Sequence, residues 1–117
     1  MRKAGAPREI LLRKGVRIVE MEEGRGPTVQ DRKRVKVAYV GRLGNASGKV
    51  FDQNNGLSFR LGRGEVIQGW DIGVQGMRVG GKRRIVVPPN AGYGKQGAGA
   101  DIPPNSTLCF DVTVVSV

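Results

Sequence analysis

Residues 64–77, GEVIQGWDIGVQGM, decide the fold because their apolar residues have the spacing of one amphipathic helix. On a period of 3.6 residues, these apolar residues fall within an arc of roughly 120°. They are Val66, Ile67, Trp70, Gly73, Val74 and Met77, and polar residues occupy the opposite face, with Ile72 as the one exception. The pattern predicts a short helix with the only Trp of the chain at the centre of its buried face.

Two glycines, Gly69 and Gly73, are unusual inside a helix because each costs about 1 kcal/mol relative to Ala. They would be tolerated if another surface approached the helix backbone too closely for a side chain. We therefore expect the rest of the chain to clasp this helix.

The segments on either side of the helix alternate between apolar and polar residues, which predicts strands. The clearest lie at residues 34–43, 57–61, 82–87 and 107–117, with a weaker one within residues 9–22. A short strand starts at Val50, and Asn55-Gly56 predicts a turn before residue 57. Five or six strands and one helix make an α+β domain, an antiparallel sheet packed on a helix.

Length, cysteine content and net charge indicate the domain number, the compartment and the kind of partner to expect. A chain of 117 residues is large enough for one domain with a real core, and the single Cys109 rules out an internal disulfide and fits a reducing, intracellular compartment. No apolar run approaches the ~20 residues of a membrane span, so no membrane partner is expected. The net charge of +10 predicts attraction to polyanions, although a solvated basic surface is an equally good interpretation.

The sequence argues against histidine-dependent catalysis, zinc or calcium sites and nucleotide binding. The chain has no His, and its carboxylates show no zinc or calcium spacing. Residues 76–83, GMRVGGKR, imitate a phosphate-binding loop but lack the Ser or Thr that would hold magnesium. No cofactor or metal is therefore expected.

The remaining candidates are aromatic residues and one carboxylate: Tyr39, Phe51, Asp52, Phe59, Trp70, Tyr93 and Phe110. Taken singly, each of these residues is more often part of a core than of a site. Two stand apart, because Asp52 directly follows Phe51 in an apolar context, and Tyr93 lies in the Gly- and Pro-rich segment 90–106. A loop of that length in a compact domain is usually functional, and an aromatic ring with a polar tip suits a ligand site.

Four segments together resemble the FKBP family of peptidyl-prolyl cis/trans isomerases, which bind tacrolimus and rapamycin. The segments are VKVAYVGRL, KVFDQNN, FRLGRGEVIQGWDIGVQGMRVGGKRRIVVPPNAGYG and IPPNSTLCFDVTVVSV. The resemblance implies a curved five- to six-stranded antiparallel sheet wrapped around one short central helix. It divides the chain into a basic arm at residues 1–14 and an isomerase domain at residues 15–117.

The resemblance also implies an active site in an apolar cleft between the sheet and the helix. Trp70 would be its floor, and Tyr39, Phe51 and Phe110 its walls. Asp52 would accept or relay a hydrogen bond, Tyr93 would donate one, and the backbone N–H of Ile67 would bind a substrate or drug carbonyl. The other contacts to substrate or drug are expected from Leu57, Phe59, Val66 and Ile102.

Three features depart from the family pattern. Leu57 stands where many members have Phe, and Ala98 and Asp101 stand where small members have His and an aliphatic residue. The 53–56 loop is also roughly four residues shorter. These changes bear on substrate preference and drug affinity more than on activity.

The implied function is isomerisation of X–Pro bonds in peptides and proteins, assisting folding or switching, and inhibitable by tacrolimus or rapamycin. In its basic charge and in the sequence of its motifs, the chain is most similar to nuclear family members that carry a nucleoplasmin-like part. This similarity implies a location in the nucleus rather than the cytoplasm. Two alternatives stay open: a non-catalytic binding module with this fold, and a basic nuclear adaptor that contacts histones or nucleic acid.

Overall fold

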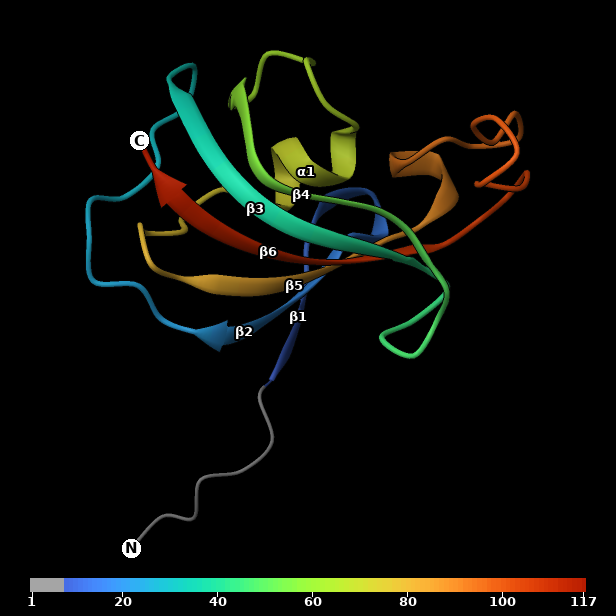
Figure 1. Cartoon of the computed structure of the whole chain (residues 1–117), viewed down its shortest axis with the longest axis horizontal. Helices are drawn as coiled ribbons and strands as arrows, with labels where there is room; N and C mark the ends of the chain where they lie inside the picture. The colour runs from blue at the N-terminus through green and yellow to red at the C-terminus, as the bar shows by residue number, and fades with distance from the viewer. Residues whose placement is uncertain (1–7) are drawn as a thin grey trace, which may run out of the picture.

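A computed structural model describes residues 8–117, which form one six-stranded antiparallel sheet in the order β1-β2-β5-β6-β3-β4 (Figure 1). The strands are β1 (Glu9–Leu11), β2 (Arg17–Glu22), β3 (Arg34–Leu43), β4 (Val50–Arg60), β5 (Lys82–Val87) and β6 (Leu108–Ser116). The helical segments are the 3₁₀ turns η1 (Arg13–Gly15) and η2 (Pro89–Ala91) and the α-helix α1 (Gln68–Gly73).

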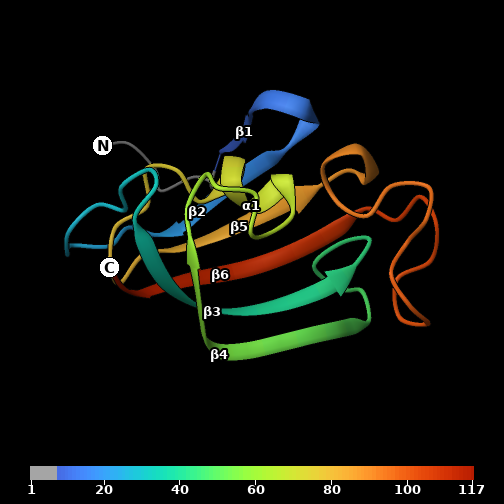
Figure 2. The same ribbon diagram turned by 90° about the horizontal axis from the view of Figure 1, so that it is seen from above.

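The sheet bends around α1, which lies on its concave face (Figure 2). The alternation predicted for the last strand is confirmed, since Leu108, Phe110, Val112 and Val114 of β6 are all buried. Their neighbours on β3 and β5 are buried or partly buried on the same face, and Trp70 and Ile72 of α1 are buried against them. The core therefore lies between the concave face and the helix, as the predicted α+β architecture requires.

The helix is shorter than the predicted range of residues 64–77, because α1 contains only Gln68–Gly73. Gly64 has a positive φ of 71° and Ile67 is extended, with ψ of 152°, so neither continues a helix. Gly76, with φ of 83°, turns the chain away at the other end. The apolar periodicity runs past the helix because Val74 and Met77 are buried from the turn that follows it.

The predicted turn at Asn55-Gly56 is wrong, because β4 runs without interruption from Val50 to Arg60. Val37 pairs with Leu57 and Tyr39 with Asn54, so one residue of β3 lies opposite two residues of β4. This arrangement is a β-bulge, which bends and twists a strand locally. The Asn-Gly pair therefore marks a bend in the strand instead of a hairpin.

The predicted weak strand within residues 9–22 is divided by η1 into β1 and β2, which pair with each other. Residues 1–7 lie outside the described part of the chain. The basic arm at residues 1–14 stays a prediction; its residues 9–11 form β1. Within residues 8–117, no helix is long and apolar enough to cross a bilayer.

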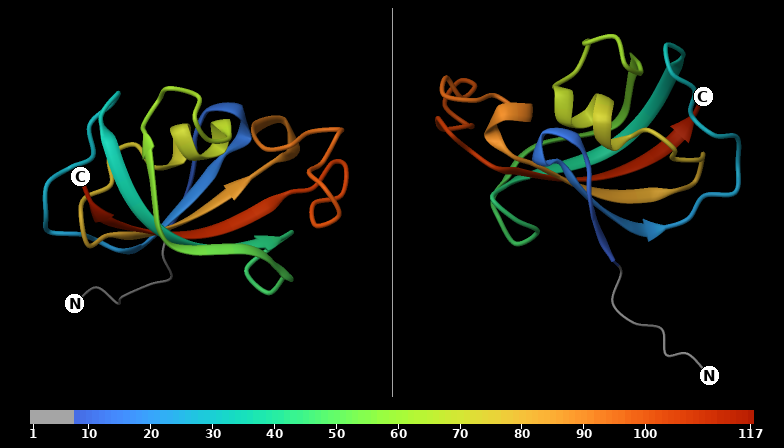
Figure 3. Two further views of the ribbon diagram at one scale, coloured as in Figure 1. Left: turned by 45° about the horizontal axis from the view of Figure 1, so that its top comes forward. Right: turned by 180° about the vertical axis from the view of Figure 1, so that it is seen from behind.

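The longest connection, between η2 and β6, projects from one end of the sheet beside the loop that joins β3 to β4 (Figure 3). A backbone hydrogen bond of 2.7 Å from Gly44 N to Thr107 O ties the two loops together. A short bridge between Ala98 and Ile102 orders the tip of the long loop. This end of the sheet is where the predicted site residue Tyr93 emerges.

Candidate functional site

The position of α1 is set by direct contact between its backbone and β5. A Cβ atom added to Gly69 would lie 2.5 Å from both Cγ atoms of Val87, and one added to Gly73 would lie 2.6 Å from Ile85 Cγ2. Both distances are shorter than real Cβ contacts allow. The prediction that the helix glycines serve a close approach is confirmed, and the surface that approaches is the middle of the sheet.

A buried arginine holds the C-terminal end of α1. Arg83, which is 5% exposed, donates from Nη1 to the carbonyl oxygens of Gly73 and Gln75, both at 2.8 Å. Its Nε and Nη2 donate to the two carboxylate oxygens of Glu20 at 3.1 and 2.8 Å. Carbonyls at the end of a helix have no partner within the helix, and Arg83 satisfies them from β5 while Glu20 of β2 neutralises its charge.

The loop that enters α1 is held by Asp71. Its two carboxylate oxygens accept hydrogen bonds from Gly62 N–H at 2.8 Å and Gly64 N–H at 3.0 Å. The loop therefore follows one path to Ile67, which is extended and precedes the helix. Among the described residues, no acceptor bonds to the Ile67 N–H, so this donor is free at the helix start.

Trp70 is the centre of an aromatic cluster between α1 and the sheet. Its ring packs edge-on against Tyr39 and Phe110, with ring centroids 4.8 and 5.3 Å apart, and tilted against Phe59 at 5.7 Å. Phe51 continues the cluster by contacting Phe110 at 5.6 Å. Edge-to-face pairs at these distances fix ring orientations beyond what area burial alone would do, so the cluster presents a preformed apolar surface.

The polar group of this surface is the Tyr39 hydroxyl, which is paired with Asp52. This hydroxyl donates a 2.5 Å hydrogen bond to Asp52 Oδ2 on the neighbouring strand. Burial of the hydroxyl and the Asp52 carboxylate beside it raise the pKa of Tyr39 well above its ordinary value. Tyr39 therefore stays a neutral donor throughout the physiological range and holds the Asp52 carboxylate in place.

These groups line a cleft of about 90 Å³. Nine residues line it: Tyr39, Phe51, Asp52, Leu57, Val66, Ile67, Trp70, Tyr93 and Phe110. Tyr93, which is 40% exposed, lies on the long loop, whereas the others come from β3, β4, β6 and the region of α1. A space of this size suits one small ring better than an extended ligand.

Two of the eleven residues predicted to form the site do not line the cleft. Phe59 is 2% exposed and packs against Trp70, so it supports the floor from the core. Ile102 is 6% exposed and belongs to the core cluster, which it joins from the long loop. Direct contact between either residue and a ligand stays a prediction, as do the individual roles of the other nine.

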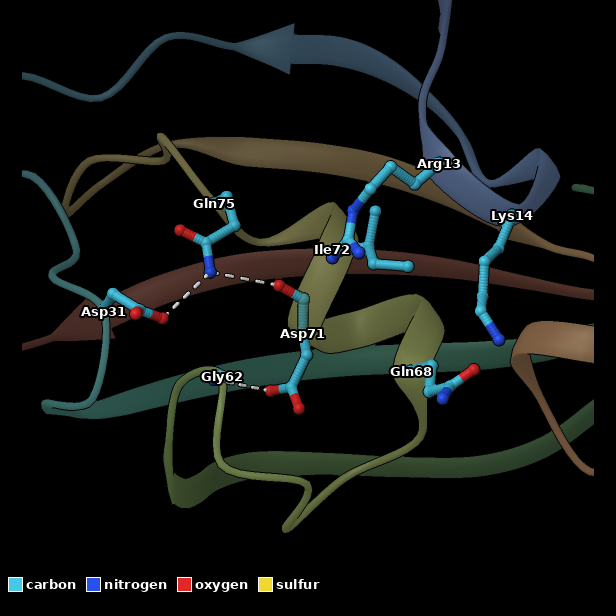
Figure 4. Close-up of a pocket in the computed structure, with 8 residues that line it drawn as sticks. All are labelled: Arg13, Lys14, Asp31, Gly62, Gln68, Asp71, Ile72 and Gln75. Atoms are coloured by element: carbon cyan, nitrogen blue, oxygen red, sulfur yellow. Dashed lines mark hydrogen bonds between the residues drawn. The ribbon is translucent and has the colours of Figure 1, made fainter.

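A larger hollow of about 350 Å³ lies along a different face of α1 (Figure 4). Its lining comprises Arg13, Lys14, Asp31, Gly62, Gln68, Asp71, Ile72 and Gln75. Gln75 donates to Asp31 at 3.4 Å and to the backbone oxygen of Asp71 at 3.2 Å, so the polar groups of this hollow largely serve each other. It has no aromatic wall and none of the predicted site residues, which makes it a poor place for apolar recognition.

The aromatic cleft has no cysteine and no metal-ligand cluster among its lining residues. Within residues 8–117, no group of three or more His, Cys, Asp or Glu side chains is arranged to hold a metal ion. Cys109 is buried on β6, away from the cleft lining, and burial raises the pKa of its thiol. The cleft offers an apolar floor, a free backbone donor and the Tyr39–Asp52 pair, which together can bind and orient an amide beside a small ring.

Sequence reasoning missed the residues that position this cleft, chiefly Arg83, Glu20 and Asp71. The sequence pattern could have indicated Arg83, because it alternates in phase with Ile85 and Val87 on β5 and so lies on the buried side of the strand. An arginine on the buried side of a strand requires partners. The partners themselves, two carbonyls after a helix turn and a carboxylate of β2, depend on the tertiary fold.

Comparison with known proteins agrees with this architecture. The sequence model described as FKBP-type peptidyl-prolyl cis-trans isomerase matches residues 26–115. The crystal structure of a peptidyl-prolyl cis-trans isomerase from Pseudomonas syringae pv. tomato is 38% identical, with a TM-score of 0.82, and covers 97% of this chain and 81% of that chain.

Two curated relatives are similar at higher identity. Peptidyl-prolyl cis-trans isomerase FKBP53 of Arabidopsis thaliana is 50% identical over 108 residues, which cover 88% of this chain and 22% of that protein. The 39 kDa FK506-binding nuclear protein of Drosophila melanogaster is 49% identical over 106 residues, 88% of this chain and 29% of that protein. The chain therefore spans about a quarter of the length of these relatives.

Proposed function

Because the chain belongs to the FKBP-type peptidyl-prolyl cis-trans isomerase family, we propose that its aromatic cleft catalyses cis/trans isomerisation of X–Pro bonds in peptides and proteins. The observation that carries the proposal is the convergence of Trp70, Tyr39, Phe110 and the free Ile67 N–H on one small apolar cleft. Its size suits a prolyl ring, with the preceding amide at the rim. Macrolide ligands such as tacrolimus and rapamycin would compete for the same floor.

The proposed mechanism uses no covalent step. Rotation about an X–Pro bond meets a barrier of about 18–20 kcal/mol from amide resonance and takes roughly 10–100 s without a catalyst. Twisting the amide removes its charge-separated resonance form, so an apolar environment disfavours the planar state relative to the twisted one. Only interactions that are stronger in the twisted state raise the rate, and a dry aromatic cleft supplies such a difference.

Each residue of the cleft would have a separate role in holding the substrate, set by where it lies. Trp70 would hold the prolyl ring against the floor, while the Ile67 N–H would bind the substrate carbonyl that lies next to the helix start. Tyr39 holds the Asp52 carboxylate at the rim, where it can accept a hydrogen bond as the amide turns. Tyr93 would donate from the long loop, which is exposed enough to adjust to different substrates.

A protease-free isomerisation assay on a Leu-Pro or Phe-Pro peptide, with and without excess rapamycin, tests this proposal. Activity that rapamycin abolishes supports an isomerase site in the cleft. Activity that resists rapamycin would mean that Leu57, Ala98 and Asp101 have reshaped the rim. A folded sample without activity would overturn the catalytic proposal in favour of a binding module with this fold.

A second role, binding of histones or nucleic acid in the nucleus, is suggested by the charge. The excess of 20 Lys and Arg over 10 Asp and Glu predicts attraction to nucleic acid more directly than to histones, which are themselves basic. Nuclear residence is proposed from the similarity to relatives named as nuclear proteins. A DNA interaction that salt weakens and that cleft mutations leave unchanged would separate this role from isomerisation.

A further inference from the structure

A cluster of positive charge lies at the end of the sheet where β3 begins and β4 ends. Six exposed side chains gather there, and we call them the basic end: Arg32, Lys33, Arg34, Lys36, Arg60 and Arg63. The ion pairs among residues 8–117 are Arg17–Glu9, Arg83–Glu20 and Arg84–Asp111, none of which includes these six. None of the six therefore makes an ion pair with another described residue, although the Glu65 carboxylate accepts a hydrogen bond from Arg60 N and Asp31 lies beside Gly62.

The register of the sheet makes this concentration costly. Arg34 lies directly opposite Arg60 in the β3–β4 pair, and Lys36 follows two residues later on the same face. Val35 and Phe59 are buried, so the intervening cations point to the convex, solvent side. Like charges directly opposite each other on paired strands destabilise a sheet, and a bound polyanion would relieve that repulsion.

The backbone of the basic end is fixed by hydrogen bonds. Arg32 N donates to Leu61 O at 2.8 Å, and Leu61 N donates to Lys33 O at 3.0 Å, which holds the turn before β3 against the end of β4. Arg32 has a positive φ of 68°, unusual for a residue with a side chain. Binding at this surface would therefore cost little backbone entropy.

Asp71 extends this framework to Arg63. By accepting hydrogen bonds from Gly62 N–H and Gly64 N–H, its carboxylate closes the turn that carries Arg63. The turn projects from the same end of the molecule as the start of β3 (Figure 1). None of the six residues of the basic end lines the aromatic cleft, although the turn that carries Arg63 leads directly to Val66 and Ile67, which do.

From these features we infer that the basic end binds the phosphate backbone of duplex nucleic acid without sequence preference. Arginine guanidinium groups match phosphate oxygens bidentately. No aromatic residue belongs to the basic end, so it lacks the stacking platform of single-strand binders. An added acidic peptide strand is disfavoured, because Glu65 Oε1 already accepts the outward N–H of Arg60 at 2.9 Å and blocks the β4 edge there.

This inference rests on the proposed binding of nucleic acid and locates it. Each phosphate contact contributes about −0.9 to the slope of log K against log salt, so six contacts predict a slope of about −5.4. Between about 50 and 200 mM salt the affinity would fall about 1,800-fold. A variant with four contacts would have a slope of about −3.6 and lose about 150-fold.

The test measures anisotropy of a short fluorescent DNA duplex with the parent chain and the double variant Arg34→Gln/Arg60→Gln. A matched control, Lys49→Gln/Lys95→Gln, removes the same charge from two exposed residues in the loops at the other end of β3. We expect the first variant to have the smaller slope and the control to behave as the parent. X–Pro isomerisation by the Arg34/Arg60 variant should be unchanged, which shows that it is folded.

Three results would overturn the inference. If both variants weaken binding equally, the chain binds DNA by diffuse charge, and the general role survives without this surface. If no duplex binds at low salt, both the surface and the nucleic-acid role are wrong, whereas the isomerase proposal is untouched. If polyglutamate of equal charge binds tighter than the duplex and depends on Arg34 and Arg60, the surface serves an acidic polypeptide.

Discussion

Replacing Gly69 by Ala tests the contact that places the helix over the sheet. The new Cβ would lie 2.5 Å from both Cγ atoms of Val87 and 3.0 Å from its Cβ, and Val87 is fully buried. Overpacking of this kind costs about 1–3 kcal/mol, whereas the better helix propensity of Ala returns up to about 1 kcal/mol. We expect a net loss of about 1–2 kcal/mol in the free energy of unfolding.

Urea unfolding of four variants, Gly69→Ala, Gln68→Ala, Val87→Ala and the double variant Gly69→Ala/Val87→Ala, measures this loss. Gln68→Ala is the matched control, because the neighbouring side chain is exposed and its replacement should change stability by less than about 0.5 kcal/mol. Adding Val87→Ala to Gly69→Ala makes room for the new methyl group. The double variant should therefore be more stable than the sum of the single losses predicts, by about 1–2 kcal/mol.

Additive losses in this cycle would refute the reasoning, because they would show that the methyl group introduced by Gly69→Ala does not meet Val87. Full stability of Gly69→Ala would refute it as well. Both outcomes would mean that α1 can move away from β5 at little cost. The position of Trp70 would then need another explanation than backbone contact.

Three further predictions concern the groups that hold the site. Arg83→Met should cost about 2–4 kcal/mol in urea unfolding because one buried and one partly buried carbonyl lose their donor. Glu20→Gln, at a carboxylate that is 45% exposed, should cost less than about 1 kcal/mol. Equal losses in the two variants would contradict the capping role of Arg83. Asp71→Ala should lower stability by about 1–3 kcal/mol and reduce kcat/KM for an X–Pro peptide, whereas unchanged values would show that the helix-entry loop holds itself. In an alkaline titration of tyrosinate absorbance, Tyr39 should ionise above the ordinary pKa of about 10. In that range Tyr39 ionises only when the chain is unfolded, so the free energy of unfolding should fall as the pH rises. Tyr39→Phe should remove both the late-titrating component and this pH dependence. If Tyr39→Phe instead removes a component that titrates early, the contact with Asp52 is contradicted.

The elements of the fold that carry strong periodicity could be predicted from the sequence. The ranges of β3 and β5 were predicted to the residue, because alternation and burial coincide there. The helix ends were not, since Val74 and Met77 continue an apolar period after Gly73 although the backbone has left the helix. Periodicity reports which side chains are buried, and it reports the backbone conformation only indirectly.

In the candidate site, the sequence likewise predicts the residues that line the cleft but does not predict the residues that hold it in place. The aromatic residues of the cleft could be named from the motifs, and nine of the eleven predicted residues line it. Its supports could not, because Arg83, Glu20 and Asp71 act through hydrogen bonds to backbone groups distant in sequence. The turn predicted at Asn55-Gly56 is wrong for a related reason: the pair lies at a bulge within β4, and that bulge depends on pairing with β3.

The central claim, that substrate and inhibitor bind over Trp70, can be tested by its fluorescence. Trp70 is the only Trp of the chain and 4% exposed, so a ligand on the cleft floor changes the emission of one known residue. Rapamycin should change this emission saturably, with the same midpoint at which it inhibits X–Pro isomerisation, and an X–Pro peptide should compete. Inhibition of isomerisation without any change in Trp70 emission would contradict the assignment of the cleft as the active site.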